Sequence, residues 1–190
     1  MNRPFCILGP AAALVAWLVI GVSWAVNSDW FVFTEHAFSD LGGVKARMPW
    51  IYNYGLILVG LLVTLYSLCP YRAAVERLEA FGSGLLLTAG LFLALIGVYP
   101  AGTRPHVFVS TWFFLQMDMA LVALSLGAYR ACRNLANMAA LALSLAAFPV
   151  YILIGITLGW PSAAVAEAYG IVVIDIVVII LTLDYLRRRV

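Results

Sequence analysis

Histidine is scarce in this chain of 190 residues, and its two copies stand close to the other polar side chains that could do chemistry. His36 lies in a mixed polar and aromatic segment, residues 27–48, and His106 follows the short turn 99–105. An imidazole can carry a proton, donate a hydrogen bond or bind a metal near neutral pH. We therefore predict a ligand-binding site formed by five polar residues in or beside these segments: Ser39, Asp40, Asn53, Arg104 and His106.

Each side chain of this set has an expected role. Ser39 and Asp40 would hydrogen-bond or orient a polar head group, and Arg104 would meet a phosphate or carboxylate. His106 would donate a hydrogen bond or carry a proton. The sequence has no G-x-S-x-G elbow, phosphate-binding loop or dinucleotide fingerprint, so we leave open whether the protein is an enzyme.

Two cofactor-based alternatives use the histidines differently. His36 and His106 could be the axial pair of a haem b in an electron-transfer protein. They could also supply two of the three protein ligands of a catalytic zinc ion, with an acidic side chain as the third. No HxxxH or HExxH spacing supports zinc, and His36 lies outside the expected helices. We therefore predict no cofactor and keep haem and zinc as alternatives.

The composition identifies the environment in which these residues must be positioned. Hydrophobic residues make up 65% of the chain and charged residues 11%, whereas soluble domains have about 45–50% and about 25%. Six continuous apolar runs each approach the ~20 residues that a helix needs to cross a bilayer. The sequence therefore predicts an all-α, six-helix integral membrane bundle that forms a single domain, residues 1–190. The expected helices span about 5–26, 49–69, 79–101, 107–129, 138–159 and 167–186.

Basic residues are distributed unevenly between the two ends of this bundle. Positive charge favours the cytoplasmic side of a membrane. The end that carries both termini holds eight of the eleven Lys and Arg residues and the opposite end holds three, namely Lys45, Arg47 and Arg104. We predict a cell-membrane protein with both termini in the cytoplasm. The same placement puts Cys6, Cys69 and Cys132 on the cytoplasmic side, where we expect thiols.

Two acidic residues fall in the middle of predicted helices, namely Asp118 in the fourth and Asp175 in the sixth. A carboxyl group at that depth is costly, so it usually faces the bundle interior and has a function. The alternative is structural, in which a protonated acid hydrogen-bonds to a neighbouring helix. On a helical wheel Asp118 and His106 lie about 120° apart, so they need not line one cavity.

The segment 27–48 is long for a connection in a compact protein, and such segments are usually functional or disordered. Because it contains Trp30, Phe31, Phe33 and Phe38, we expect it to fold back over the outer end of the bundle. Small residues within the helices are expected to permit close backbone approach. They include Gly55, Gly60, Gly84, Gly90, Ala94, Gly97 and Gly170.

Three short motifs resemble those of a prokaryotic six-helix membrane family known as domain of unknown function 998. The segment Ser39-Asp40-Leu41-Gly42 resembles its SDLG element, and Asn53-Tyr54-Gly55 resembles the N-x-G start of its second helix. Gly97-Val98-Tyr99-Pro100 followed by His106 resembles its G-x-x-P … H turn. The resemblance implies six helices and one outer set of Ser39, Asp40, Pro100 and His106, without His36. Related elements in proteins of the damage-regulated autophagy modulator type suggest a link to lipids.

Taken with the membrane setting, the polar set predicts an outer-face pocket that binds a lipid or another amphiphile. Membrane lipids are the expected partners. Nucleic acid is excluded because no basic patch with interleaved aromatic residues is present. Two alternatives stay open: a haem or metal protein that uses His36 and His106, and a non-enzymatic assembly subunit with a membrane-protein partner or a second copy of itself.

Overall fold

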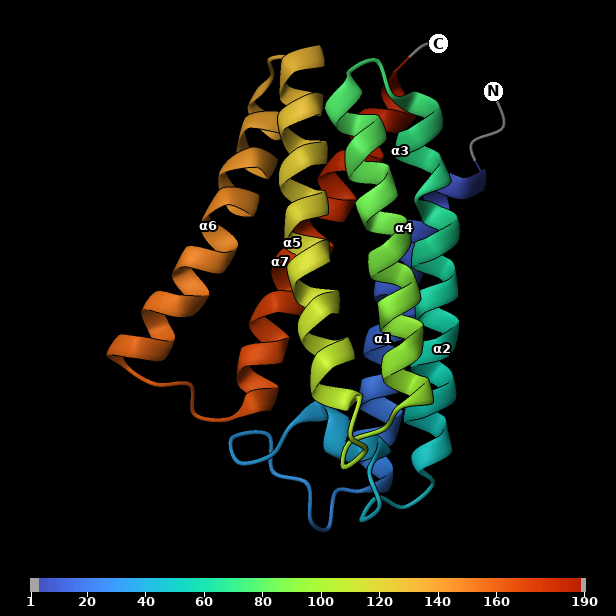
Figure 1. Ribbon diagram of the computed structural model, residues 1–190, viewed down its shortest axis with the longest axis vertical. Helices are drawn as coiled ribbons and strands as arrows, with labels where there is room; N and C mark the ends of the chain where they lie inside the picture. Colours follow the sequence, from blue (N-terminus) through green and yellow to red (C-terminus); the bar gives the residue numbers. More distant parts are fainter. Residues whose placement is uncertain (1–3, 189–190) are drawn as a thin grey trace.

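The computed structural model describes residues 4–188, and these form a helical bundle (Figure 1). Six helices are long and apolar enough to cross a membrane, with α2 and α3 together forming one span. No strand occurs within residues 4–188, so the all-α, six-helix prediction is confirmed. The elements are α1 (Pro4–Val26), the 3-10 helix η1 (Phe38–Gly42), α2 (Pro49–Tyr66), α3 (Leu68–Ala73), α4 (Arg77–Val98), α5 (His106–Ala131), α6 (Leu135–Thr157) and α7 (Ala163–Arg187).

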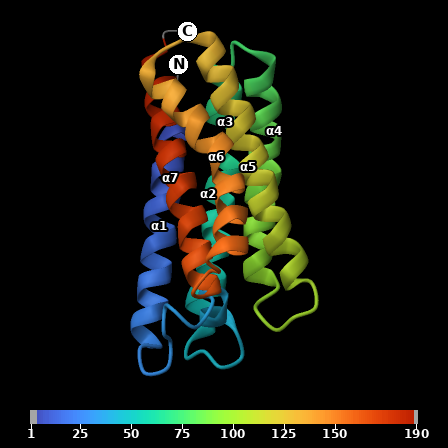
Figure 2. The ribbon, with the colours of Figure 1, turned by 90° about the vertical axis from the view of Figure 1, so that its left-hand side faces the viewer.

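The bundle has two distinct ends. Residues 27–48, the turn 99–105 and the link 158–162 lie at one end, here called the loop end. The start of α1, the end of α7 and the links 74–76 and 132–134 lie at the other, here called the basic end. Seen from the side, α1 and α7 stand together across the bundle from α4 and α5, with α2 between them (Figure 2).

Small residues bring α4 close to its neighbours. A side chain at Gly60 of α2 would collide with the backbone of Gly90 and Ala94, and one at Gly127 of α5 would collide with Glu79. Such close approach lets helices pack through van der Waals contact in a solvent that offers no hydrophobic drive. Gly84 does not share this role, contrary to our prediction, because its face of α4 is open.

A buried ionic cluster closes the basic end. The Glu79 side chain is fully buried, and its carboxylate accepts a hydrogen bond of 2.6 Å from Arg188, which also pairs with Asp184 at 2.6 Å. Burial lowers the pKa of the Arg188 guanidinium, but the two carboxylates raise it by more, so this pKa lies above its usual value. Asn137 of α6 donates to Asp184 at 3.1 Å. The cluster thereby ties α4, α6 and α7 together.

Removing the centre of this cluster is expected to destabilise the protein strongly. Glu79→Ala leaves Arg188 without its buried partner, which should lower the free energy of unfolding by about 3–5 kcal/mol. The control is Asp29→Ala at the exposed pair Arg47–Asp29, where the expected loss is below about 1 kcal/mol. Chemical denaturation in detergent micelles measures both losses. Equal losses in the two variants would contradict a special role for the cluster.

Helix α6 leaves the bundle as it approaches the loop end (Figure 1). Its buried residues, Asn137, Ala140 and Ser144, all lie in its first half. Pro149 follows them, and because proline lacks an N–H and crowds the carbonyl four residues before it, it favours a bend. Beyond Pro149 most of the apolar side chains of α6 are exposed, and the exposed fraction of Ile156 is 77%. The far half of α6 therefore stands apart from α5 and α7.

The cysteines correct one of our predictions. Cys6 and Cys69 form a disulfide with Cα atoms 4.9 Å apart, where we had expected thiols. The start of α1 packs against α3, which brings the two residues within bridging distance although they are 63 positions apart in sequence. Sequence spacing could not reveal this contact. Cys132 is free and exposed.

Cys132 offers a direct test of orientation, because it lies at the basic end that we predict to be cytoplasmic. A membrane-impermeant maleimide added to intact cells should leave Cys132 unlabelled and should label it after lysis. The Thr103→Cys variant in a Cys132→Ala background carries its thiol on the exposed turn of the loop end, so the maleimide should label it in intact cells. Labelling of Cys132 in intact cells would reverse the predicted topology. The measurement is a mass shift of the purified protein.

Candidate functional site

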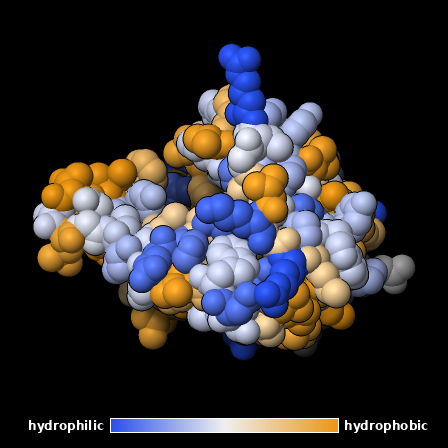
Figure 3. Space-filling view, turned by 90° about the horizontal axis from the view of Figure 1, so that it is seen from below, coloured by the Kyte–Doolittle hydropathy of each residue, from blue (hydrophilic) through white to orange (hydrophobic). Residues whose placement is uncertain are grey.

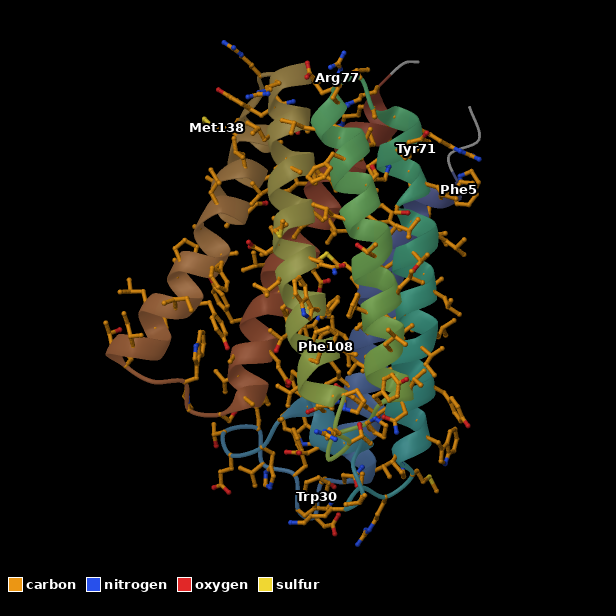
Figure 4. All side chains as sticks on the ribbon, in the orientation of Figure 1. Phe5, Trp30, Tyr71, Arg77, Phe108 and Met138 are labelled. Atoms are coloured by element: carbon orange, nitrogen blue, oxygen red, sulfur yellow. A yellow bond between two sulfur atoms is a disulfide. The ribbon has the colours of Figure 1, made fainter. Side chains whose placement is uncertain are left out.

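The long segment 27–48 is closed at its base by a single buried side chain. Asn27 is fully buried, and its side-chain oxygen Oδ1 accepts hydrogen bonds from the Arg47 amide at 2.6 Å and the Trp30 indole at 3.0 Å. Its side-chain nitrogen donates to the carbonyl of Ser23 and to that of Arg47. Asn27 therefore joins the two ends of the segment, which makes an ordered loop of this length possible. Figure 4 shows Trp30 at the loop end and Arg77 at the basic end.

The start of α7 holds the middle of the same segment. The Ser162 hydroxyl donates to the carbonyl of Phe33 at 2.6 Å, and the Ala164 amide donates to that of His36 at 2.9 Å. One turn deeper, the Glu167 carboxylate accepts a hydrogen bond of 2.8 Å from the Phe38 amide. These three bonds place η1 across the end of the bundle.

The three motifs that carry the family resemblance meet at η1, which the SDLG motif itself forms. Asn53 donates to the Gly42 carbonyl at 3.0 Å, and its own backbone lies against Gly97. A side chain at Gly42 would collide with the side chains of Asn53 and Tyr52, so a larger residue here would displace one of them. Nδ1 of His106 donates to the Tyr99 carbonyl at 2.8 Å, which holds the turn between α4 and α5. Asn53 thus positions the backbone of η1, and its amide nitrogen is already engaged.

A central cavity of about 110 Å³ runs down the bundle from this junction. Its deep walls are apolar and include Leu56, Val59 and Leu86. Polar side chains from four different elements line it near the loop end, namely Ser39, Tyr52, His106 and Glu167. We call these four residues the polar mouth. Asp40 is not one of them, because it does not line the cavity, and its carboxylate accepts a hydrogen bond of 2.9 Å from the Ala37 amide that caps η1.

The polar mouth has unused hydrogen-bonding capacity. The Tyr52 ring is buried, and within residues 4–188 its hydroxyl has no hydrogen-bond partner, nor does that of Ser39. The carboxylates of Glu167 and Asp40 lie within electrostatic range of Tyr52. His106 donates through Nδ1 to the Tyr99 carbonyl, and its Nε2 makes no hydrogen bond with any residue of 4–188. Three elements thus present free acceptors or hydroxyls to one small space.

A second space, here called the lateral cleft, lies between α5, α6 and α7 and has a volume of about 310 Å³. It exists because the far half of α6 stands off the bundle, and Figure 3 shows that half as a lobe beside the body of the molecule, with hydrophobic patches among residues of intermediate hydropathy. Ser110, Phe114, Glu167 and Ile174 line both the central cavity and the lateral cleft. The two spaces are therefore neighbours that share one wall.

The structure separates the two intramembrane acids. Asp175 lines the central cavity and accepts a hydrogen bond of 2.8 Å from the Trp17 indole of α1. Asp118 lines the lateral cleft, and its carboxyl group has no hydrogen-bond partner in the described part of the chain. Asp175 thus joins two helices, whereas Asp118 makes no such link among residues 4–188. His106 and Asp118 line different spaces.

The remaining predicted residues lie outside both spaces. His36 packs its ring against Trp30 and Phe31, with centroids 5.3 and 5.7 Å away. Arg104 is exposed on the turn 99–105. Neither lines the central cavity or the lateral cleft. Among the residues described, no group of three His, Cys, Asp or Glu side chains could hold a metal ion. The haem and zinc alternatives therefore gain no geometric support.

Three residues that the geometry brings to the fore lie outside our predicted set of five: Asn27, Tyr52 and Glu167. No local pattern ties Glu167 to Phe38, because the two residues are 129 positions apart. The one available signal was that Tyr52 adjoins Asn53 of the N-x-G motif.

Glu167 is expected to control the stability of η1. Glu167→Ala removes the acceptor of the Phe38 amide, and a hydrogen bond to a charged group contributes about 1.5–3 kcal/mol. Exchange of the Phe38 amide hydrogen should become roughly 10- to 100-fold faster, as measured by mass spectrometry on the protein in lipid nanodiscs. Glu167→Gln keeps an acceptor oxygen and should stay near the wild-type rate. Unchanged exchange in Glu167→Ala would show that η1 is held by other contacts.

Comparison with known proteins identifies the family. The family model described as "Protein of unknown function (DUF998)" matches residues 10–184, which reach from the first membrane helix to the last. No curated protein and no solved structure matches the chain. The three motifs that suggested this family, SDLG, N-x-G and G-x-x-P … H, are those that meet at η1. The chain belongs to the DUF998 family of membrane proteins.

Proposed function

We propose that this protein binds an amphiphile from the membrane, with the polar end of that molecule in the polar mouth at the outer face. One observation carries the proposal. The central cavity is apolar along most of its length, and its unused hydrogen-bonding groups are gathered at one end. Ligand pockets with mostly apolar walls and a few convergent polar groups are the usual form of a small-molecule site.

The position of the polar mouth agrees with an amphiphile rather than a water-soluble ligand. Tyr52 lies in the first turn of α2, His106 begins α5, and Glu167 lies in the second turn of α7. All three are thus near one end of their membrane helices, at the depth where a lipid head group meets the acyl region. An apolar tail would point from there toward the bilayer centre.

The chemistry of the mouth favours a head group that donates hydrogen bonds. Nε2 of His106 and the free oxygen of Glu167 are acceptors, and the hydroxyls of Ser39 and Tyr52 can act in either sense. A hydroxyl or amino group would satisfy these atoms. Arg104 is exposed on the adjacent turn, where contact with a phosphate stays a prediction. Asp40 and Asn53 support the site by holding η1.

The cavity itself is too small for a whole lipid. Its volume of about 110 Å³ falls below the roughly 300–1,000 Å³ that is typical of drug-sized ligands. The central cavity therefore takes a head group with a short part of its chain, and the rest of the chain must lie elsewhere.

The Tyr52 hydroxyl provides the test. Tyr52→Phe keeps the buried ring and removes one partner of the head group, which costs about 1–3 kcal/mol or roughly 5- to 100-fold in affinity. The probe is a monoacylglycerol with a diazirine in its chain, added to the protein in nanodiscs, and half-saturation of photolabelling is measured. Tyr54→Phe is the control, because Tyr54 is 68% exposed and faces away from the cavity. Photolabelling that never saturates, or that spreads evenly over the lipid-facing helices, would overturn the proposed function.

A further inference from the structure

We propose that the lateral cleft binds the chain of a single-chain amphiphile with an amino or hydroxyl head group, and that this molecule enters from the membrane between α6 and the bundle. The inference rests on the proposed function and adds the route and the head-group class. It is carried by three features: the shape of the cleft, its shared wall with the central cavity, and its charge.

The shape of the cleft suits an acyl chain. With about 310 Å³ it reaches the range of typical ligand pockets, which the central cavity does not. Most of its lining is apolar and includes Leu115, Phe148 and Val173. The Trp160 ring packs against Tyr151 of α6 and Tyr169 of α7, with centroids 5.4 and 5.5 Å away. This aromatic group bridges the two helices near the loop end and keeps them apart by a fixed spacing.

The shared wall connects the chain to the head group. Glu167 and Ser110 line both spaces, so a head group at Glu167 touches the polar mouth while its chain continues into the cleft. Phe114 and Ile174 form the apolar part of the same wall. A molecule with one chain fits this path, because the central cavity leaves room for little more than the head group.

The charge of the cleft selects the head group. Its ionisable lining residues are Asp118, Glu167 and the tyrosines, and no Lys or Arg of the described chain lines it. Glu167 lies where the cleft adjoins the polar mouth, and one of its carboxylate oxygens accepts no hydrogen bond from residues 4–188. An amino or hydroxyl head group can donate to that oxygen. A phosphate would be repelled by both acids.

Three hexadecyl probes with the same chain diazirine test the inference: the amine, the alcohol and the phosphate. In nanodiscs the amine and the alcohol should label peptides of α5, α6 and α7 saturably, and the phosphate should bind at least about tenfold more weakly. Glu167→Gln, which keeps an acceptor oxygen for the Phe38 amide, should weaken the amine about tenfold and the alcohol by less than about threefold. Gly170→Leu, which fills the cleft beside Phe114, should weaken both by about tenfold or more. The control is Gly84→Leu on the open face of α4, which should change nothing.

The outcomes separate the inference from the function on which it rests. Saturable labelling near Ser39, Tyr52 and His106 that is indifferent to Gly170→Leu would overturn the inference and leave the proposed function standing. Equal binding of all three head groups would overturn the choice of an amino or hydroxyl ligand. No saturation by any probe would overturn both. A cleft that is filled by a helix of a second copy would appear as photolabel-resistant dimers, which also contradicts the inference.

Discussion

The hydrogen bond between the Glu167 carboxylate and the Phe38 amide determines how the loop end is built. It fixes η1 to α7, and η1 in turn carries Ser39 to the cavity and Gly42 to Asn53. The same carboxylate lines both the central cavity and the lateral cleft. Because lipid offers no hydrogen bonds, a carboxylate near the membrane interior needs such a partner within the protein. Glu167 therefore connects loop structure, cavity lining and cleft lining through one side chain.

The sequence was sufficient for the six helices because their signal is local. Each apolar run approaches the bilayer thickness, and each helix satisfies its own backbone, so no long-range contact has to be known. Some helices begin or end a few residues away from the predicted bounds, because polar caps and turns determine where a helix starts and stops. The sixth span begins at Ala163 rather than 167, since Ser162 caps it by accepting from the Val165 amide. The third span ends at Val98 rather than 101, before the turn that His106 holds.

The site depended on contacts that no local pattern contains. Asn27 and Arg47 are joined across 20 positions, Cys6 and Cys69 across 63, and Phe38 and Glu167 across 129. The two intramembrane acids show the same limit. Asp118 and Asp175 look alike in sequence, and only the position of Trp17 on a distant helix gives one of them a partner. The position of each acid near the middle of its helix could be predicted from the sequence. Its hydrogen-bond partner could not, because that partner comes from another helix of the packed bundle.

The two ends of α6 explain why a cleft forms on this side of the molecule. Near the basic end, Asn137 donates to Asp184 and Ser144 shares a 3.2 Å hydrogen bond with Ser125, so the first half of the helix is fixed to α5 and α7. The far half is held by the Tyr169 hydroxyl, which donates to the Ala147 carbonyl just before Pro149, and by the ring contacts of Trp160 with Tyr151 and Tyr169. A helix fixed at one end and spaced by aromatic rings at the other leaves a wedge that no side chain of the bundle fills. In a bilayer such a wedge opens toward the acyl chains, which is why the proposed route of entry lies between α6 and the bundle.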